Sequence, residues 1–208
     1  MINTLFILDF FDRDAFVLIN QRLASPAVDS TMIALSNPYI LVPLYVIFLG
    51  MALRKFKTRF YLPIVFIIIA FGLSDSISSK ICKPFFQRVR PAFETSLSPR
   101  LPEKEWKKDA GGKRSLETKL PGSRFGFVSS HSANVFAVFL TASFVLGLSR
   151  RIRVILMYLA SAIAYSRVYL GVHYLGDVLF GALLGLIIFF FLIAIWKRFD
   201  FGPKNVFS

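Results

Sequence analysis

Residues 166–177 have the sequence Ser-Arg-Val-Tyr-Leu-Gly-Val-His-Tyr-Leu-Gly-Asp and join two long apolar segments. His173 and Asp177 are four residues apart and would share a face at the start of a helix. A carboxylate bonded to one ring nitrogen fixes the histidine tautomer and makes the other nitrogen the better nucleophile. Arg167 lies six residues before His173 and suits a bidentate phosphate contact. The stretch therefore indicates phosphoryl chemistry at the end of an apolar helix.

Two further motifs lie upstream of this stretch. Lys83 is followed, after six residues, by Arg90-Pro91, which adds a point charge and a second guanidinium for an anion. Ser129-Ser130-His131 contains the chain's only other histidine. At a helix start, the Ser129 side chain and the Ser130 backbone N–H would hold a phosphate oxygen. The three motifs together supply three cations, two imidazoles and one carboxylate.

Together these motifs resemble the type 2 phosphatidic acid phosphatase superfamily, and the resemblance covers Lys83 to Asp177. It implies that Lys83, Arg90 and Arg167 bind phosphate, that His173 is the nucleophile forming a phosphohistidine and that Asp177 orients it. His131 would then protonate the leaving group as the general acid. The second motif departs from the family's usual Pro-Ser-Gly-His, because this chain has Val128-Ser129-Ser130-His131.

Each motif also has a purely structural interpretation. Lys83 and Arg90 could snorkel at a membrane boundary, and Ser129 could be a plain N-cap. His173 could be an interfacial histidine beside an aspartate that stabilises a helix N-terminus. The altered second motif would also suit a non-catalytic membrane binder or transporter. Two histidines and an aspartate could bind zinc, but the neighbouring cations would repel it, so no metal and no cofactor are expected.

The composition is that of an integral membrane protein with one domain, residues 1–208. The mean hydropathy is +0.61, 55% of the residues are hydrophobic and 24 are Phe. The formal net charge is +13, but the charges lie in loops between apolar segments. Such placement favours membrane lipids as partners and excludes nucleic acid. Cys82 is the single cysteine, which excludes an internal disulfide. The sequence contains no indication of the oligomeric state.

The expected fold is an all-α bundle of five transmembrane helices plus an amphipathic interfacial helix at the N-terminus, residues 1–28. Each span has about 18–23 residues, the length that crosses a bilayer as a helix. Pro26 would end the interfacial helix, and Asn37-Pro38 would kink the first span or delay its start. The expected spans are Thr31–Leu53, Tyr61–Ile81, Ser130–Leu148, Ile152–Tyr169 and Tyr174–Trp196.

Short basic connections predict how the bundle sits in an inner membrane. Residues 54–59, 150–153 and 197–204 are rich in Lys and Arg and fall on one side if five spans alternate. The positive-inside rule makes that side cytoplasmic. The loop 82–129 and the turn near Gly171, which carry the motifs, would then face the periplasm or cell exterior.

One carboxylate falls inside an expected span. Asp75 lies among serines in the second span, where a charge is costly and indicates either a function or a buried partner. Lys80 or an arginine of the phosphate site could pair with it.

The resemblance implies dephosphorylation of a lipid phosphate or diphosphate, independent of metal. A compact chain with an outward site is similar to bacterial undecaprenyl-diphosphate phosphatases, so undecaprenyl diphosphate is the expected substrate. Lipid A and phosphatidylglycerol phosphate are alternatives, and the basic outer loop would suit a large anionic headgroup. A lipid phosphotransferase could use the same phosphohistidine.

Overall fold

The structure is a computed structural model that describes residues 11–94, 96–97, 99–100 and 124–201. Within these ranges the regular structure is helical, apart from one antiparallel bridge between Val89 and Phe125. A π-helical turn, Ile77–Cys82, joins two of the helices without a break. The labelled helices are α2 (Pro26–Ser36), α3 (Val42–Phe56), α4 (Tyr61–Ser76), α5 (Lys83–Phe86), α6 (Ser130–Val145), α7 (Arg150–Tyr169) and α8 (Leu175–Arg198).

Four helical segments are long and apolar enough to cross a membrane: Pro38–Arg59, Tyr61–Phe86, Arg150–Tyr169 and Leu175–Arg198. α6 is also apolar but has only 16 residues. A multi-pass, all-helical membrane protein is therefore confirmed for the described residues, while the count of five spans stays a prediction.

The first expected span, Thr31–Leu53, is interrupted at Asn37-Pro38, where the sequence predicts a kink or a late helix start. α2 ends at Ser36, and Asn37 is extended with φ −83° and ψ 118°. The residue before a proline is pushed out of the helical region, which explains the break at Pro38. The Asn37 side chain then accepts a hydrogen bond from Tyr39 N at 3.0 Å and starts a short 3₁₀ turn. The spanning segment accordingly begins at Pro38 instead of Thr31.

The N-terminal helix packs against the bundle. It is described over residues 11–22, and residues 1–10 of the expected interfacial segment lie outside the described ranges. Phe16 is fully buried and makes an edge-on contact with Tyr174, with ring centroids 5.8 Å apart. Asn20 is also fully buried and donates to Tyr169 O at 2.7 Å. Pro26 begins α2 rather than ending this helix, which is consistent with proline's preference for a first helical turn.

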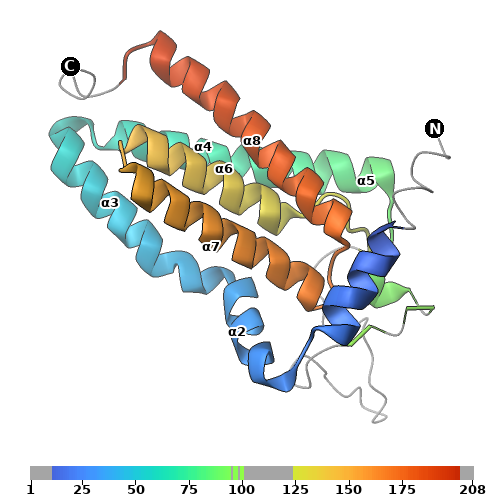
Figure 1. Cartoon of the computed structure of the whole chain (residues 1–208). Helices are drawn as coiled ribbons and strands as arrows, with labels where there is room; N and C mark the ends of the chain where they lie inside the picture. The colour runs from blue at the N-terminus through green and yellow to red at the C-terminus, as the bar shows by residue number, and fades with distance from the viewer. Residues whose placement is uncertain (1–10, 95, 98, 101–123, 202–208) are drawn as a thin grey trace, which may run out of the picture.

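α6 is the central helix and packs against α4, α7 and α8 (Figure 1). α8 approaches it closely because glycines face it: a Cβ at Gly181 would lie 2.6 Å from Ser129 O, and one at Gly185 would lie 2.7 Å from Ala133 O. Small residues spaced four apart allow such close packing of membrane helices. The start of α6 is therefore held against the start of α8.

The three motifs meet at one end of the bundle. α5, the start of α6, the end of α7 and the start of α8 converge there, beside the N-terminal helix (Figure 1). The basic stretches 54–59, 150–153 and 197–198 lie at the other end, where α3 meets α4, α6 meets α7 and α8 ends. Segments more than 80 residues apart in the sequence thus form one site.

Candidate active site

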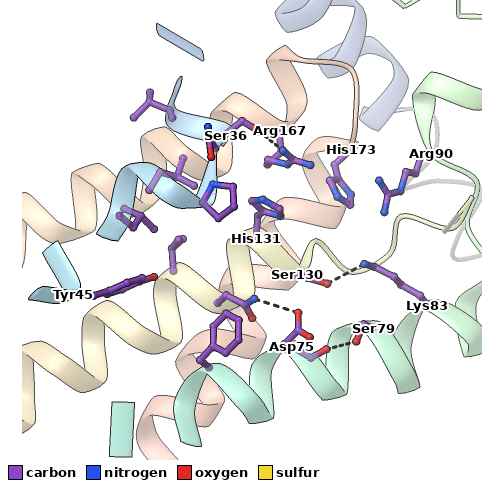
Figure 2. A pocket seen from close by; sticks show the side chains of 18 residues that line it. Ser36, Tyr45, Asp75, Ser79, Lys83, Arg90, Ser130, His131, Arg167 and His173 are labelled. Atoms are coloured by element: carbon purple, nitrogen blue, oxygen red, sulfur yellow. Dashed lines mark hydrogen bonds between the residues drawn. The ribbon is translucent and has the colours of Figure 1, made fainter. Parts of the chain in front are cut away.

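A cavity of about 330 Å³ lies at the end of the bundle where the motifs meet (Figure 2). Its wall comes from helices α2 to α7, from the 3₁₀ turn Pro38–Leu41 and from the turn before α8. Cations and imidazoles from all three motifs face it. The expected site residues that line it are Lys83, Arg90, Ser130, His131, Arg167 and His173.

The other two expected residues lie behind this wall. Asp177 is fully buried, and its Oδ2 is 3.3 Å from Nδ1 of His173. Ser129 is also fully buried, and its backbone N–H donates to Asp177 O at 2.9 Å. The described cavity wall includes Ser130 but not Ser129. Ser129 therefore does not face the cavity, and it contacts the site residues only through its hydrogen bond to the Asp177 backbone.

The contact between His173 and Asp177 arises differently from the sequence expectation. His173 precedes α8 and does not share a helix face with Asp177, because the helix begins only at Leu175. Asp177 is instead the third residue of a capping box, in which its Oδ2 accepts from Tyr174 N at 3.1 Å. The cap turns the chain so that His173 lies over the carboxylate. With an ionised Asp177, Nδ1 carries the proton and Nε2 is the nucleophilic nitrogen.

Each of the three cations is held by a different element. Lys83 Nζ donates to Ser130 Oγ at 2.9 Å. Arg90 Nε donates to Phe125 O at 3.2 Å, and Arg167 donates to Ser36 Oγ. Cations anchored from separate elements can surround an anion, as the binding of several phosphate oxygens requires.

A short pairing inside the expected loop 82–129 places Arg90. Arg90 N donates to Arg124 O at 3.1 Å, and Gly126 N donates to Arg88 O at 2.8 Å. A Cβ at Gly126 would lie 2.9 Å from Arg90 Cγ and 3.0 Å from Asp177 Oδ2. Glycine is therefore needed here, because the backbone passes directly against the site. Residues 101–123, with most of the basic outer loop, lie outside the described ranges.

Arg88 and Asp12 belong to the site, and the sequence interpretation did not include them. Arg88 NH1 is 2.9 Å from Asp177 Oδ1 and 2.9 Å from Asp12 Oδ2. Asp12 Oδ1 accepts from Gly176 N at 2.7 Å. The Arg88 guanidinium also lies 4.2 Å from the ring centroid of Tyr174. The N-terminal helix thus closes the back of the site through a carboxylate–arginine–carboxylate chain.

One sequence signal could have identified Arg88. In an extended segment, residues two apart point to the same side, so Arg88 and Arg90 should face the same site. Asp12 had no comparable signal, because its charge fits the polar face of an amphipathic helix equally well.

Asp75 also lines the cavity (Figure 2). Its Oδ1 accepts a hydrogen bond from Asn134 Nδ2 at 3.3 Å, whereas the sequence suggested Lys80 or an arginine of the phosphate site as its partner. Ser79 Oγ donates to the Asp75 backbone carbonyl at 2.5 Å.

A buried histidine backed by a carboxylate, facing three cations in a cavity between membrane helices, defines a membrane phosphatase. Comparison with known proteins agrees: residues 60–200 match the PAP2 superfamily, and the chain belongs to it. The family and its phosphatase members make this chain a metal-independent lipid phosphatase of the inner membrane. Among the described residues, no group of three or more His, Cys, Asp or Glu side chains is placed to hold a metal ion.

Several relatives carry specific names. The chain is 30% identical over 172 residues to a lipid A 4'-phosphatase of Bacteroides thetaiotaomicron, covering 81% of this chain and 70% of that protein. It is 26% identical over 186 residues to a lipid A 4'-phosphatase of Porphyromonas gingivalis, covering 89% and 72%. It is 33% identical over 141 residues to phosphatidylglycerophosphatase B of Bacillus subtilis, covering 64% of this chain and 56% of that protein.

Two solved structures share the fold. A transmembrane PAP2-type phosphatidylglycerolphosphate phosphatase from Bacillus subtilis has a TM-score of 0.65 at 26% identity, covering 94% of this chain and 88% of that one. Aquifex aeolicus LpxE has a TM-score of 0.61 at 25% identity, covering 87% and 93%.

The pH dependence of the first chemical step follows from the burial of His173. Burial lowers the pKa of His173 to about 4, although the hydrogen bond to Asp177 opposes this shift. A lowered histidine pKa means that the neutral nucleophile persists down to about pH 5. We expect the rate of phosphohistidine formation, measured by rapid quench with labelled substrate, to fall to half near pH 4, where His173 becomes protonated. A midpoint near pH 6.5 would contradict this, provided that it is the same for substrates whose own phosphate groups have different pKa values.

Replacing Arg88 by glutamine should lower kcat about 10- to 100-fold. The substitution removes a charge-assisted hydrogen bond to buried Asp177, and such bonds contribute about 1.5–3 kcal/mol. Phosphate release at saturating substrate measures the effect. Arg22→Gln is the matched control, because Arg22 is an exposed arginine on the N-terminal helix. A change confined to KM would instead place Arg88 in substrate binding.

Proposed function

We propose that the chain hydrolyses a lipid phosphate monoester through a phosphohistidine on His173. The observation that carries this is the position of His173: it faces the three cations in the cavity, while Asp177 holds its Nδ1 from behind. Nε2 of His173 attacks phosphorus, and the bond from phosphorus to the lipid oxygen breaks. His131 gives a proton to that oxygen. Water then attacks the phosphohistidine and gives a proton back to His131, which releases inorganic phosphate and neutral His173.

The 4'-phosphate of lipid A is the substrate that the relatives favour, with phosphatidylglycerol phosphate second. Both lipid A 4'-phosphatases align with more than four fifths of this chain. Phosphatidylglycerophosphatase B aligns with less of it, although a phosphatase for that lipid shares the fold. None of these relatives is named for undecaprenyl diphosphate, so the expectation from the sequence has less support than its alternatives.

We also propose that the site faces the periplasm or cell exterior. The basic stretches lie at the end of the bundle opposite the cavity, and the positive-inside rule assigns such stretches to the cytoplasm. Cysteine labelling tests this in a Cys82→Ser background. A membrane-impermeant maleimide should label Asp14→Cys in intact cells and Ser149→Cys only after permeabilisation. Both positions are exposed, at the site end and at the basic end respectively. The reverse pattern would overturn the orientation.

The substrate is tested with detergent-purified protein and a panel of lipid A, phosphatidylglycerol phosphate, phosphatidic acid and undecaprenyl diphosphate, in the presence of EDTA. We expect the highest kcat/KM with lipid A, with phosphate lost from the 4' position. Highest activity with undecaprenyl diphosphate would overturn the monoester proposal. Transfer of label to an added acceptor lipid, in place of phosphate release, would show a phosphotransferase.

A further inference from the structure

The cavity has a layered lining whose order follows the helices. Ser130, which binds Lys83, belongs to the phosphate end. Asn134 lies four residues further along α6, which is about 6 Å deeper at 1.5 Å per residue. Asp75 contacts Asn134 and so lies at the same depth. Phosphate-binding cations are therefore followed by a polar layer.

Apolar side chains lie beside and beyond this polar layer. Phe71 is one helical turn from Asp75 on α4, and Ile163 is one turn from Arg167 on α7. Val135 follows Asn134 on α6, and all three apolar side chains line the same cavity. Beyond the cations, the lining is thus a polar pair surrounded by apolar side chains.

The polar layer is held in place by its own contacts. Asn134 Oδ1 accepts a hydrogen bond from Ser74 Oγ at 2.7 Å, which fixes the orientation of the amide. Its Nδ2 then points to Asp75 Oδ1 at 3.3 Å. The Asp75 carboxylate lines the cavity, and it has capacity for further donors because an ionised carboxylate accepts about four hydrogen bonds (Figure 2).

The charge of Asp75 restricts what can occupy this layer. A hydrocarbon chain would leave the carboxylate unsolvated, which is costly within a membrane. A second phosphate group, as in a lipid diphosphate, would be repelled by a like charge. A hydroxyl or amide N–H of the substrate can donate to the carboxylate. The matching ligand is a phosphate ester of an alcohol that carries its own hydrogen-bond donors before its hydrocarbon tails.

We propose that Asp75 and Asn134 form a second subsite, which binds hydroxyl or N–H groups of the leaving alcohol. This inference rests on the proposed function and adds the substrate class: monophosphates of hydroxylated or amide-bearing lipid headgroups. It separates sugar or glycerol phosphates from prenyl diphosphates, which have no donor at this distance from the scissile phosphate. Asp75 and Asn134 thus determine specificity, whereas the motif residues act on the phosphate.

A matched pair of substrates tests the subsite. Hexadecylglycerol phosphate has one free glycerol hydroxyl, and its deoxy analogue lacks only that hydroxyl. The wild-type protein should prefer the hydroxylated substrate by about 10-fold or more in kcat/KM, as expected for a hydrogen bond to a partly buried charge. Asp75→Leu should bring the ratio close to one, because the loss should fall on the hydroxylated substrate much more than on the deoxy analogue. Asn134→Ala should reduce the ratio in the same direction.

Asp14→Asn is the control, because Asp14 is an exposed carboxylate on the N-terminal helix; it should leave the ratio unchanged. An equal loss on both substrates in Asp75→Leu, or an unaltered ratio in both cavity variants, would overturn the subsite. If the wild type hydrolyses neither substrate, the proposed function fails instead. Binding of the two product alcohols then decides the subsite: a preference for the hydroxylated alcohol that Asp75→Leu removes supports it, and equal binding overturns it.

Discussion

Replacing His173 by alanine should lower phosphate release by on the order of 10⁴-fold or more, because the variant loses the nucleophile of a covalent mechanism. His173 is 2% exposed and its Nδ1 lies 3.3 Å from Asp177, so a water molecule in its place would lack both the position and the basicity of Nε2. Release of inorganic phosphate from the preferred lipid, measured under saturating conditions, gives the loss. Base-quenched wild-type protein should carry labelled phosphate that acid treatment releases, as an N–P bond requires, and the variant should carry none.

Two controls separate chemistry from folding. His173→Ala should still bind vanadate, because Lys83, Arg90 and Arg167 all remain in the cavity. His131→Ala makes the same change at the only other histidine. It should still become labelled from an aryl phosphate, whose leaving group needs no general acid. Label on His131 in the His173 variant would reverse the two proposed roles.

The location of the site was predictable from the sequence because of helix alternation. Each motif lies at the end of an apolar segment, and alternating spans bring every second connection to one side. Lys83, His131 and His173 therefore had to lie near one another at one end of the bundle. The approximate bounds of Tyr61–Phe86, Arg150–Tyr169 and Leu175–Arg198 followed from length and hydropathy alone.

The contacts behind the site were not predictable in the same way. Arg88 lies 76 residues after Asp12 in the chain, and a periodic pattern identifies which face is apolar without identifying what covers it. The capping box of Asp177 was also missed, because its cap residue is Tyr174 instead of the usual Ser, Thr, Asp or Asn. Because a sequence pattern does not identify which helices face one another, the sequence could suggest a partner for Asp75 but could not identify Asn134.

Replacing Asp177 by asparagine should lower kcat by about 10³- to 10⁴-fold, comparable to the loss when the carboxylate behind a catalytic histidine is removed elsewhere. The Asp177 carboxylate accepts from His173 Nδ1, from Tyr174 N and from Arg88. An asparagine can turn its amide nitrogen toward Nδ1, which would force the proton onto Nε2 and block attack on phosphorus. The loss should therefore appear in the formation of phosphohistidine, measured in a single turnover.

Asp12→Asn is the informative comparison, because it removes the other carboxylate from the same arginine. Arg88 would keep Asp177 as its partner, so His173 should keep its tautomer and most of its activity. We expect Asp12→Asn to lower thermal stability, through the contacts to Arg88 and to Gly176 N, while kcat falls less than 10-fold. If both variants lost activity equally and in proportion to stability, Asp177 would support the fold and would not orient His173. If kcat falls strongly in Asp177→Asn alone and phosphate binding is intact, then the Asp177 carboxylate controls the reactivity of His173.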